Sequence, residues 1–483
     1  MKQITGYKGK TAKTFNWFFP VVFLILTFVL MFLREPFFDE AHAWMVSKSF
    51  SFLELFKIEK YEGHLFIWHT LLAPFSKNNL FYPYSMYVLN WIFCAGAVIV
   101  FWNKAPFSLI EKTLITFSYP FVWYFAIVAR CYSIGIFFLF LILSYWNERL
   151  KHPVLISLLL IILANTSAMA LIDAFSLGLI FIYDLFKKNK FKNIYPFLIM
   201  LFGALLVLIQ LFGAYHPDVL QLAGQKIFFY NLMVYFYLFD FKNLDIFYIQ
   251  NKITAFIILA SYIVSCFYFY KNKRALFFFL TTFILMFLLF AFKYSGAWWH
   301  YLFFYIYLIS SIWLLRLEKE QKSIFNKTFN ILFLTLLFSF CLTTLFFHSA
   351  FKSEVYNSKT REISEIINQK KLFEGNKKIY ALDVFSEAST GIMPYYDNIE
   401  IYNVWGNKKY TLDEYKHYME GGKREDLIDS LCASLDKNKL NIGITGRKMH
   451  PFYNGFKYYL ALKPLYQNND PYFMIYEIKG ILK

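Results

Sequence analysis

The sequence predicts a polytopic α-helical membrane protein of about eleven spans that carries a small α/β domain at its C-terminal end. Three observations support this fold class. Hydrophobic residues make up 58% of the 483-residue chain, and charged residues only 17%. Apolar windows of about 20 residues, the length that a helix needs to cross the hydrocarbon core, recur as far as residue 348. After residue 349, charged residues, Asn and Gly become frequent, and short alternating runs replace the long apolar windows.

The long apolar windows define the predicted spans. A single segment in lipid satisfies its backbone hydrogen bonds internally only as a helix, so each window is expected to be helical. The eleven spans are expected at about residues 15–33, 84–102, 108–126, 131–147, 153–169, 170–186, 193–214, 253–270, 275–292, 298–315 and 328–348.

The charges between the spans predict their orientation. Lysines precede the first span, and basic connections follow every second span after it, at residues 104–112, 149–151, 187–192, 271–274 and 316–327. Because Lys and Arg concentrate in cytoplasmic loops, these connections are expected on the inner side. The net charge of +17 is then mostly carried by short loops that face anionic lipid headgroups, and nucleic acid is excluded as a partner.

The first outside loop, residues 34–83, belongs in this prediction to a multispan domain of residues 1–349. Two acids, Asp39 and Glu40, follow the first span directly. A carboxylate in such a half-dry position is able to act as a general base. Because the loop is predicted to be extracytoplasmic, chemistry is expected at the outer surface of the cell membrane.

Residues 350–483 predict a small extracytoplasmic α/β domain. Alternating apolar runs predict strands at 377–385, 399–405, 440–446 and 472–478, and residues 412–435 have the apolar spacing of a helix. About 130 residues are enough for a separate hydrophobic core. An odd number of spans after an inner N-terminus places this domain outside.

Cysteine usage and short motifs exclude several classes of protein. The five cysteines are scattered singly, at positions 94, 131, 266, 341 and 432, so no disulfide framework is expected. The sequence also contains no phosphate-binding P-loop and no GxGxxG motif. A nucleotide-driven pump is therefore not expected.

Polar side chains recur at the predicted outer ends of the spans. Arg130 and Tyr132 begin the fourth span, and Lys293 and His300 bracket the segment before the tenth. All are predicted at the same level as Asp39. A cavity with several cationic or hydrogen-bonding groups is able to bind a lipid-linked phosphate, and a carboxylate base in it is able to activate a hydroxyl.

This pattern resembles the GT-C superfamily of polyprenyl-phosphate-sugar glycosyltransferases, especially the branch of the protein O-mannosyltransferases and the lipid A aminoarabinose transferase. Members have an Asp-Glu pair in the first outside loop, an HPPLYY-like segment before the second span, an R-x-Y start to the fourth, and often a C-terminal extracytoplasmic domain. The matching residues are Asp39-Glu40, His64 to Trp68, Arg130-Cys131-Tyr132 and residues 350–483. Leu65 and Phe66 stand where the family has its two prolines.

The resemblance implies transfer of a sugar from polyprenyl phosphate to a hydroxyl of a glycan, lipid or protein acceptor in the cell envelope. The reaction would invert the anomeric carbon and need no cofactor. Asp39 would be the base, with Glu40 as a second catalytic candidate. The leaving phosphate would be bound by His64, Arg130, Tyr132, Lys293 and His300.

Each role has a structural alternative. Glu40 could cap a helix N-terminus, where its charge meets the helix dipole favourably. Arg130 could extend to the outer headgroups, and Lys293 and His300 could belong to an interfacial belt with the neighbouring tryptophans. A divalent cation held by Asp39, Glu40, His42 and His64 is a further alternative, but no HExxH or tight His/Cys cluster indicates a metal, so none is predicted.

Two other functional classes fit part of the pattern. An envelope glycan polymerase or ligase shares the multispan body and outer arginines, but does not predict the Asp39-Glu40 pair or the C-terminal domain. A transporter needs a polar pathway near the bilayer midplane, and Asp173, inside the sixth predicted span, is the main candidate for one.

Overall fold

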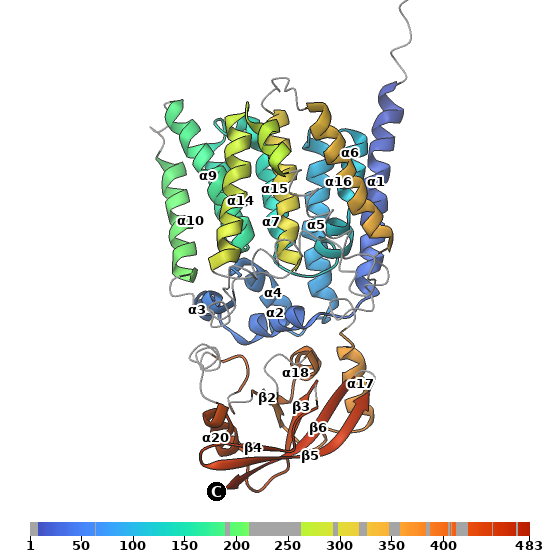
Figure 1. The fold of residues 1–483 in the computed structure, drawn as a ribbon, viewed down its shortest axis with the longest axis vertical. Coiled ribbons are helices and arrows are strands. Elements are labelled where there is room, and N and C mark those ends of the chain that lie inside the picture. The colour runs from blue at the N-terminus through green and yellow to red at the C-terminus, as the bar shows by residue number, and fades with distance from the viewer. Residues whose placement is uncertain are drawn as a thin grey trace, which may run out of the picture. The chain divides into compact units, whose positions relative to one another are not determined.

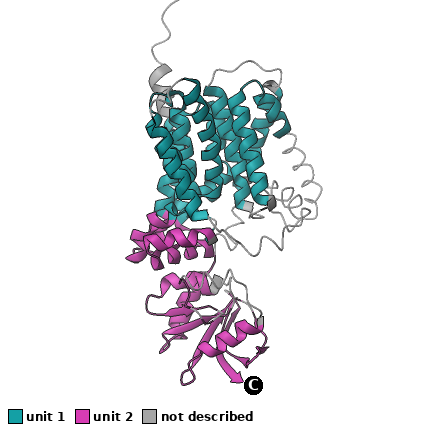
Figure 2. Ribbon diagram, turned by 90° about the vertical axis from the view of Figure 1, so that its left-hand side faces the viewer, with its two compact units in different colours: residues 1–31, 62–68, 88–348 teal, residues 32–61, 69–87, 349–483 magenta. Residues whose placement is uncertain are grey.

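The protein, studied as a computed structural model, forms two compact units (Figure 2). Unit 1 contains residues 1–31, 62–68 and 88–348, and unit 2 contains residues 32–61, 69–87 and 349–483. The structure describes residues 8–62, 64–188, 194–211, 262–292, 298–317, 326–346, 358–382, 387–403, 406, 408–411, 424–446, 448–469 and 472–483. The predicted domain boundary after residue 349 lies next to the observed one. The first outside loop, predicted as part of 1–349, instead groups mostly with the C-terminal residues.

Unit 1 is built from helices (Figure 1). The long apolar windows form α1 (Lys8–Phe32), α5 (Tyr84–Lys104), α7 (Tyr132–Tyr145), α8 (Pro153–Ala164), α9 (Ala168–Lys187), α10 (Tyr195–Leu211), α14 (Lys273–Phe292), α15 (Trp298–Leu317) and α16 (Asn326–Phe346). Within the unit, α8 packs against α7, α9 and α10, and α14 packs against α9 and α15.

Four of these helices are long and apolar enough to cross a membrane: Tyr84–Lys104, Ala168–Lys187, Lys273–Phe290 and Trp299–Leu317. Five shorter apolar helical segments accompany them among the described residues. This composition supports a membrane protein. Eleven crossings stay a prediction, and half of the eighth predicted span, residues 253–261, lies outside the described part of the chain.

The third predicted span, residues 108–126, is wrong as a single helix. Helix α6 (Leu109–Thr116) is only eight residues long, and a short π-helix, η1 (Pro120–Phe125), follows it. Proline lacks a backbone N–H and clashes with the preceding turn, so it favours the first turn of a new helix over the interior of an existing one. After this break, residues 126–131 connect η1 to the start of α7.

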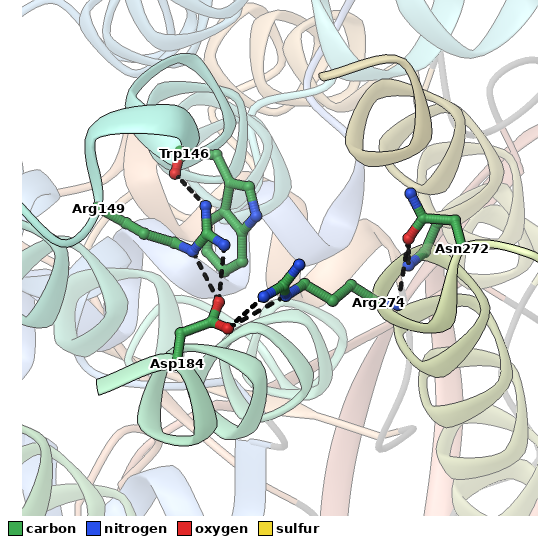
Figure 3. Close-up of polar contacts among 6 residues, drawn as sticks. Trp146, Arg149, Asp184, Asn272 and Arg274 are labelled. Carbon is green, nitrogen blue, oxygen red and sulfur yellow. Dashed lines mark hydrogen bonds and ion pairs between the residues drawn. The ribbon is translucent and has the colours of Figure 1, made fainter. Parts of the chain in front are cut away.

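One end of unit 1 carries buried ion pairs that join the ends of three helices (Figure 3). Arg149, which follows α7, donates from Nε to Oδ2 of Asp184 near the end of α9, at 2.9 Å. Arg274, in the first turn of α14, donates to the other oxygen of the same carboxylate. The basic connections that were predicted on one side of the membrane, at 149–151 and 271–274, therefore meet at one end of this unit.

A further ion pair joins two other predicted basic connections, at 104–112 and 316–327. Arg316, near the end of α15, pairs with Glu111 of α6 at 2.6 Å. Helix α15 begins close to His300, 16 residues earlier, so His300 and Arg316 are separated by roughly 24 Å along the helix axis. His300, one of the polar residues predicted at the outer ends of the spans, thus lies at the far end of α15 from this ion pair.

Unit 2 combines the first outside loop with the C-terminal residues. The loop forms α2 (Phe38–Ser49), α3 (Phe52–Glu62) and α4 (Ile67–Lys77), and the C-terminal part contributes α17 (Thr360–Gln369), α18 (Glu387–Ile392) and α20 (Arg424–Ser434). The strands are β1 (Lys378–Ala381), β2 (Glu400–Tyr402), β3 (Asn441–Thr445), β4 (Phe452–Asn454), β5 (Tyr458–Asn469) and β6 (Tyr472–Leu482). The first part of the predicted helix at 412–435, residues 412–423, lies outside the described residues.

The six strands form one mixed sheet in the order β2-β1-β3-β6-β5-β4. Strand β1 is parallel to β2 and β3, whereas β6 is antiparallel to both β3 and β5. The four predicted strands are confirmed as β1, β2, β3 and β6. Strands β4 and β5 were not predicted.

Two hydrophobic cores flank this sheet. One contains Val46, Phe50, Leu55 and Ile58 of the loop helices together with sheet residues such as Ile444. The second lies under α20 and includes Leu431 and Tyr476. Because the loop helices supply part of the first core, the first outside loop and the C-terminal domain form one folded body.

Candidate functional site

His64 is held in unit 1 by polar contacts to the turn between α8 and α9. The backbone N–H of Phe66 donates to Oε1 of Gln210 at 2.9 Å, and the Gln210 amide donates in turn to Oδ1 of Asn165 at 2.8 Å. His64 itself forms an isolated β-bridge with Ser167, the N-cap of α9. A buried glutamine on an apolar helix requires such partners. The Gln210 contact to Phe66 and the bridge of His64 to Ser167 together hold the chain on both sides of Leu65.

Arg130 and Cys131 reach His64 from the segment between η1 and α7. A guanidinium N–H of Arg130 donates to Nε2 of His64, and Cys131 Sγ lies 3.4 Å from Nδ1. Because arginine only donates, Nε2 of His64 is the acceptor in this contact. Asn90 of α5 supports this segment by donating to the carbonyl oxygen of Phe125 at 3.0 Å.

Tyr132 extends the cluster to α15. Its hydroxyl lies 2.9 Å from Nε2 of His300, and its ring meets that of His64 edge-on, with centroids 6.0 Å apart. Trp299, next to His300, stacks on Tyr124. Four residues predicted as phosphate-binding, His64, Arg130, Tyr132 and His300, are therefore brought together from three separate parts of the chain.

The burial of this cluster defines its chemistry. Arg130, Tyr132 and His300 are 8%, 1% and 4% exposed, and His64 is half-buried. A guanidinium in such a poorly solvated place interacts strongly with an anion. The phenol and the two imidazoles add polar groups beside it. Lys293, the fifth predicted member, lies outside the described residues.

The guanidinium of Arg130 is buried and contacts the imidazole of His64. Hydrogen bonds from a guanidinium to phosphate oxygens are strong and often bidentate, so an oxyanion is a natural ligand for Arg130.

Asp39 and Glu40 lie in the first turn of α2, in unit 2. Glu40 is fully buried and forms an ion pair with Arg34, and it also accepts the backbone N–H of Phe37 at 2.7 Å. These contacts match the alternative role of Glu40, which is to cap the N-terminus of a helix. Of the two acids, Asp39 is the one that is partly exposed.

Burial changes the acid–base behaviour of side chains near α2. Desolvation raises the pKa of Glu35, although the backbone N–H of Arg361 donates to it at 3.2 Å. Desolvation likewise raises the pKa of Tyr395 to about 12. The segment that precedes the acidic pair is thus a partly dry environment, as predicted for the loop.

The part of the chain that the structure describes contains no candidate metal site. Among the described residues, no three His, Cys, Asp or Glu side chains gather in an arrangement that could hold a metal ion. His42, one of the alternative ligands, is instead contacted by Tyr410, with 3.0 Å between Nδ1 and the phenol oxygen. Metal independence stays a prediction.

Two members of the cluster were not predicted from the sequence. Gln210 fixes the position of His64, and Cys131 contacts its ring. A glutamine inside an apolar window is itself a signal, because polar groups at membrane depth usually have a partner. Cys131 has no comparable signal, since cysteine is common in apolar interiors.

In comparisons with known proteins, no family model, no curated protein and no solved structure matches this chain.

Proposed function

We propose that the protein is an integral membrane glycosyltransferase that moves a sugar from a polyprenyl-phosphate donor to a hydroxyl of an envelope acceptor, with inversion of the anomeric carbon. The observation that carries the proposal is the convergence of Arg130, Tyr132, His64 and His300 in one buried cluster. We also propose that this cluster and the C-terminal domain are on the extracytoplasmic side.

The cluster would bind the phosphate of the donor. Its guanidinium offers a fixed positive charge, and burial strengthens the interaction with an anion. The Arg130–His64 contact orients the guanidinium, and the Tyr132 hydroxyl offers a further hydrogen bond when it is not bound to His300. One fixed charge suits the single negative charge of a phosphodiester, and Lys293 is proposed as an additional cation.

The reaction would be a single displacement. The acceptor oxygen attacks the anomeric carbon while its proton passes to the Asp39 carboxylate. The bond between the anomeric carbon and the phosphate oxygen breaks, and its electron pair stays on the departing polyprenyl phosphate. The new negative charge is the one that Arg130 stabilises. Asp39 suits the base role better than Glu40, because Asp39 is partly exposed whereas the Glu40 carboxylate is buried against Arg34.

The proposal is tested by assaying the purified full-length protein in lipid nanodiscs. Polyprenyl phosphates that carry different radiolabelled sugars are supplied with envelope fractions as acceptors, and both transferred label and released polyprenyl phosphate are measured. We expect equal amounts of the two products with one donor. Release without transfer would indicate hydrolysis, and no reaction with any donor would overturn the proposal.

One observation favours a second candidate, a transporter. Asp173 on α9 is fully buried, and neither carboxylate oxygen has a hydrogen-bond partner among the described residues. Ionisable groups of this kind often serve ion pathways in membrane proteins. Uptake of labelled sugar phosphates into proteoliposomes, abolished by Asp173→Asn, would support this alternative over glycosyl transfer. The polymerase or ligase alternative predicts chain extension of a lipid-linked glycan in the same nanodisc assay.

A further inference from the structure

Tyr410 in the C-terminal domain contacts the helix that carries the proposed base. Its hydroxyl lies 3.0 Å from Nδ1 of His42, and the two rings are 5.3 Å apart. His42 follows Asp39 by three residues on α2, so the two side chains lie on the same face of the helix. Both are half-exposed, whereas the intervening Glu40 and Ala41 are buried.

The backbone at Tyr410 has an unusual conformation. Its φ is +61°, in the left-handed region that aromatic residues rarely adopt. The flanking backbone is held by Lys409, whose N–H donates to the carbonyl oxygen of Ile401 at 2.9 Å. The Tyr410 side chain is buried in the core shared by the loop helices and the sheet. A strained residue that is held on both sides and directed at one side chain indicates a constrained position.

The rest of α2 is fixed by other contacts. Glu40 binds Arg34 at the N-terminal end, and Lys48 pairs with Asp397 at 2.6 Å near the C-terminal end. Val46 of α2 is buried in the core that includes residues of the sheet, so the Tyr410 hydroxyl is not the sole attachment of α2. Its specific effect is on the His42 ring, because a hydrogen bond at Nδ1 determines which way the imidazole turns and which nitrogen carries the proton.

We propose that His42 contacts the acceptor beside Asp39, and that Tyr410 is a positioning residue for His42. The acceptor class is a polyhydroxyl compound, because the proposed reaction attacks through a hydroxyl group and an imidazole ring can hydrogen-bond a neighbouring hydroxyl. The C-terminal domain then takes part in acceptor binding. This inference rests on the proposed glycosyl transfer.

The test compares Tyr410→Phe, His42→Gln and the double variant in the nanodisc assay, with Tyr396→Phe as a matched control. Tyr396 is in the same domain, and its hydroxyl donates to the Ser364 carbonyl oxygen at 3.1 Å. We expect each single variant to raise the acceptor KM about tenfold, the effect of one lost hydrogen bond, with an unchanged donor KM. The double variant should lose no more than His42→Gln, because Tyr410 acts through His42.

Several outcomes would overturn the inference. They are an unchanged acceptor KM in Tyr410→Phe, an equal rise of the donor KM, an additive loss in the double variant, or the same loss in Tyr396→Phe. The last result would show a general effect on domain stability. A wild-type protein that transfers no sugar would instead overturn the proposed function itself. The two failures are distinguished by the activity of the wild type.

Discussion

Replacing Arg130 by alanine should weaken donor binding far more than acceptor binding. Arg130 is buried, and its guanidinium contacts the ring of His64 in the cluster proposed to bind phosphate. A hydrogen bond to a charged group contributes about 1.5–3 kcal/mol, so losing two of them at the lower value costs roughly 3 kcal/mol. This corresponds to about a 150-fold rise in the donor KM.

Arg130→Lys should have a smaller effect. Lysine keeps the charge but lacks the planar fork, so one bond of about 1.5 kcal/mol is lost, which is about a tenfold rise in the donor KM. His64→Ala should add little to Arg130→Ala, because the two side chains act as a contacting pair. Arg316→Lys is the control, since this arginine pairs with Glu111 and is remote from the cluster.

The assay is initial-rate transfer in nanodiscs, with donor and acceptor concentrations varied separately. Thermal unfolding of each variant verifies that it is folded. A donor KM that stays at the wild-type value in active Arg130→Ala would refute the assignment, and the arginine would then be a structural or headgroup contact. Equal effects of Arg130→Ala and Arg316→Lys would show that donor binding depends on overall stability and not on this cluster.

Four further predictions use the same preparations. Asp39→Asn should lower kcat by about 10²–10⁴-fold with normal folding, because the amide cannot accept the hydroxyl proton; an active variant would exclude Asp39 as the base. Glu40→Ala should destabilise the protein by about 3–5 kcal/mol in denaturant unfolding, since it leaves a buried arginine unpaired; normal stability with lost transfer would instead indicate a catalytic role. Asp173→Asn should keep transfer and unfold at the same or a higher temperature, because a buried carboxyl group with no hydrogen-bond partner among the described residues is costly; lost transfer would contradict this. A reporter after Lys483 should be extracytoplasmic and one at Lys273 cytoplasmic; the same side for both would refute the predicted topology.

The positions of the long helices and of several site residues could be predicted from the sequence. A window of about 20 apolar residues has few alternatives to a helix, and the start of such a window places Tyr132 and His300 at helix ends. Because those ends were assigned to one side by the alternating charges, their proximity was expected. The cluster confirms that His64, Arg130, Tyr132 and His300 lie close together, but not what they bind.

Other features depend on contacts that a single sequence does not reveal. The break at Pro120 occurs inside a mostly apolar window, residues 108–126, whose length fits a single span. Strand β5 (Tyr458–Asn469) includes Pro464, which is uncommon inside a strand. Its apolar and polar residues also alternate only weakly. The shared core of loop and C-terminal domain joins Val46 to Ile444. Nearly 400 residues separate these two, and their pairing depends on the tertiary fold.

The most direct test of the proposed function is to measure the release of polyprenyl phosphate from the donor. Purified protein is incubated with a polyprenyl-phosphate sugar and an envelope acceptor, and free polyprenyl phosphate is quantified against glycosylated acceptor for wild type, Asp39→Asn and Arg130→Ala. We predict one polyprenyl phosphate released for each sugar transferred by the wild type, and almost none from either variant. Equal release by wild type and both variants, or no release from any donor, would contradict a glycosyltransferase that uses these residues.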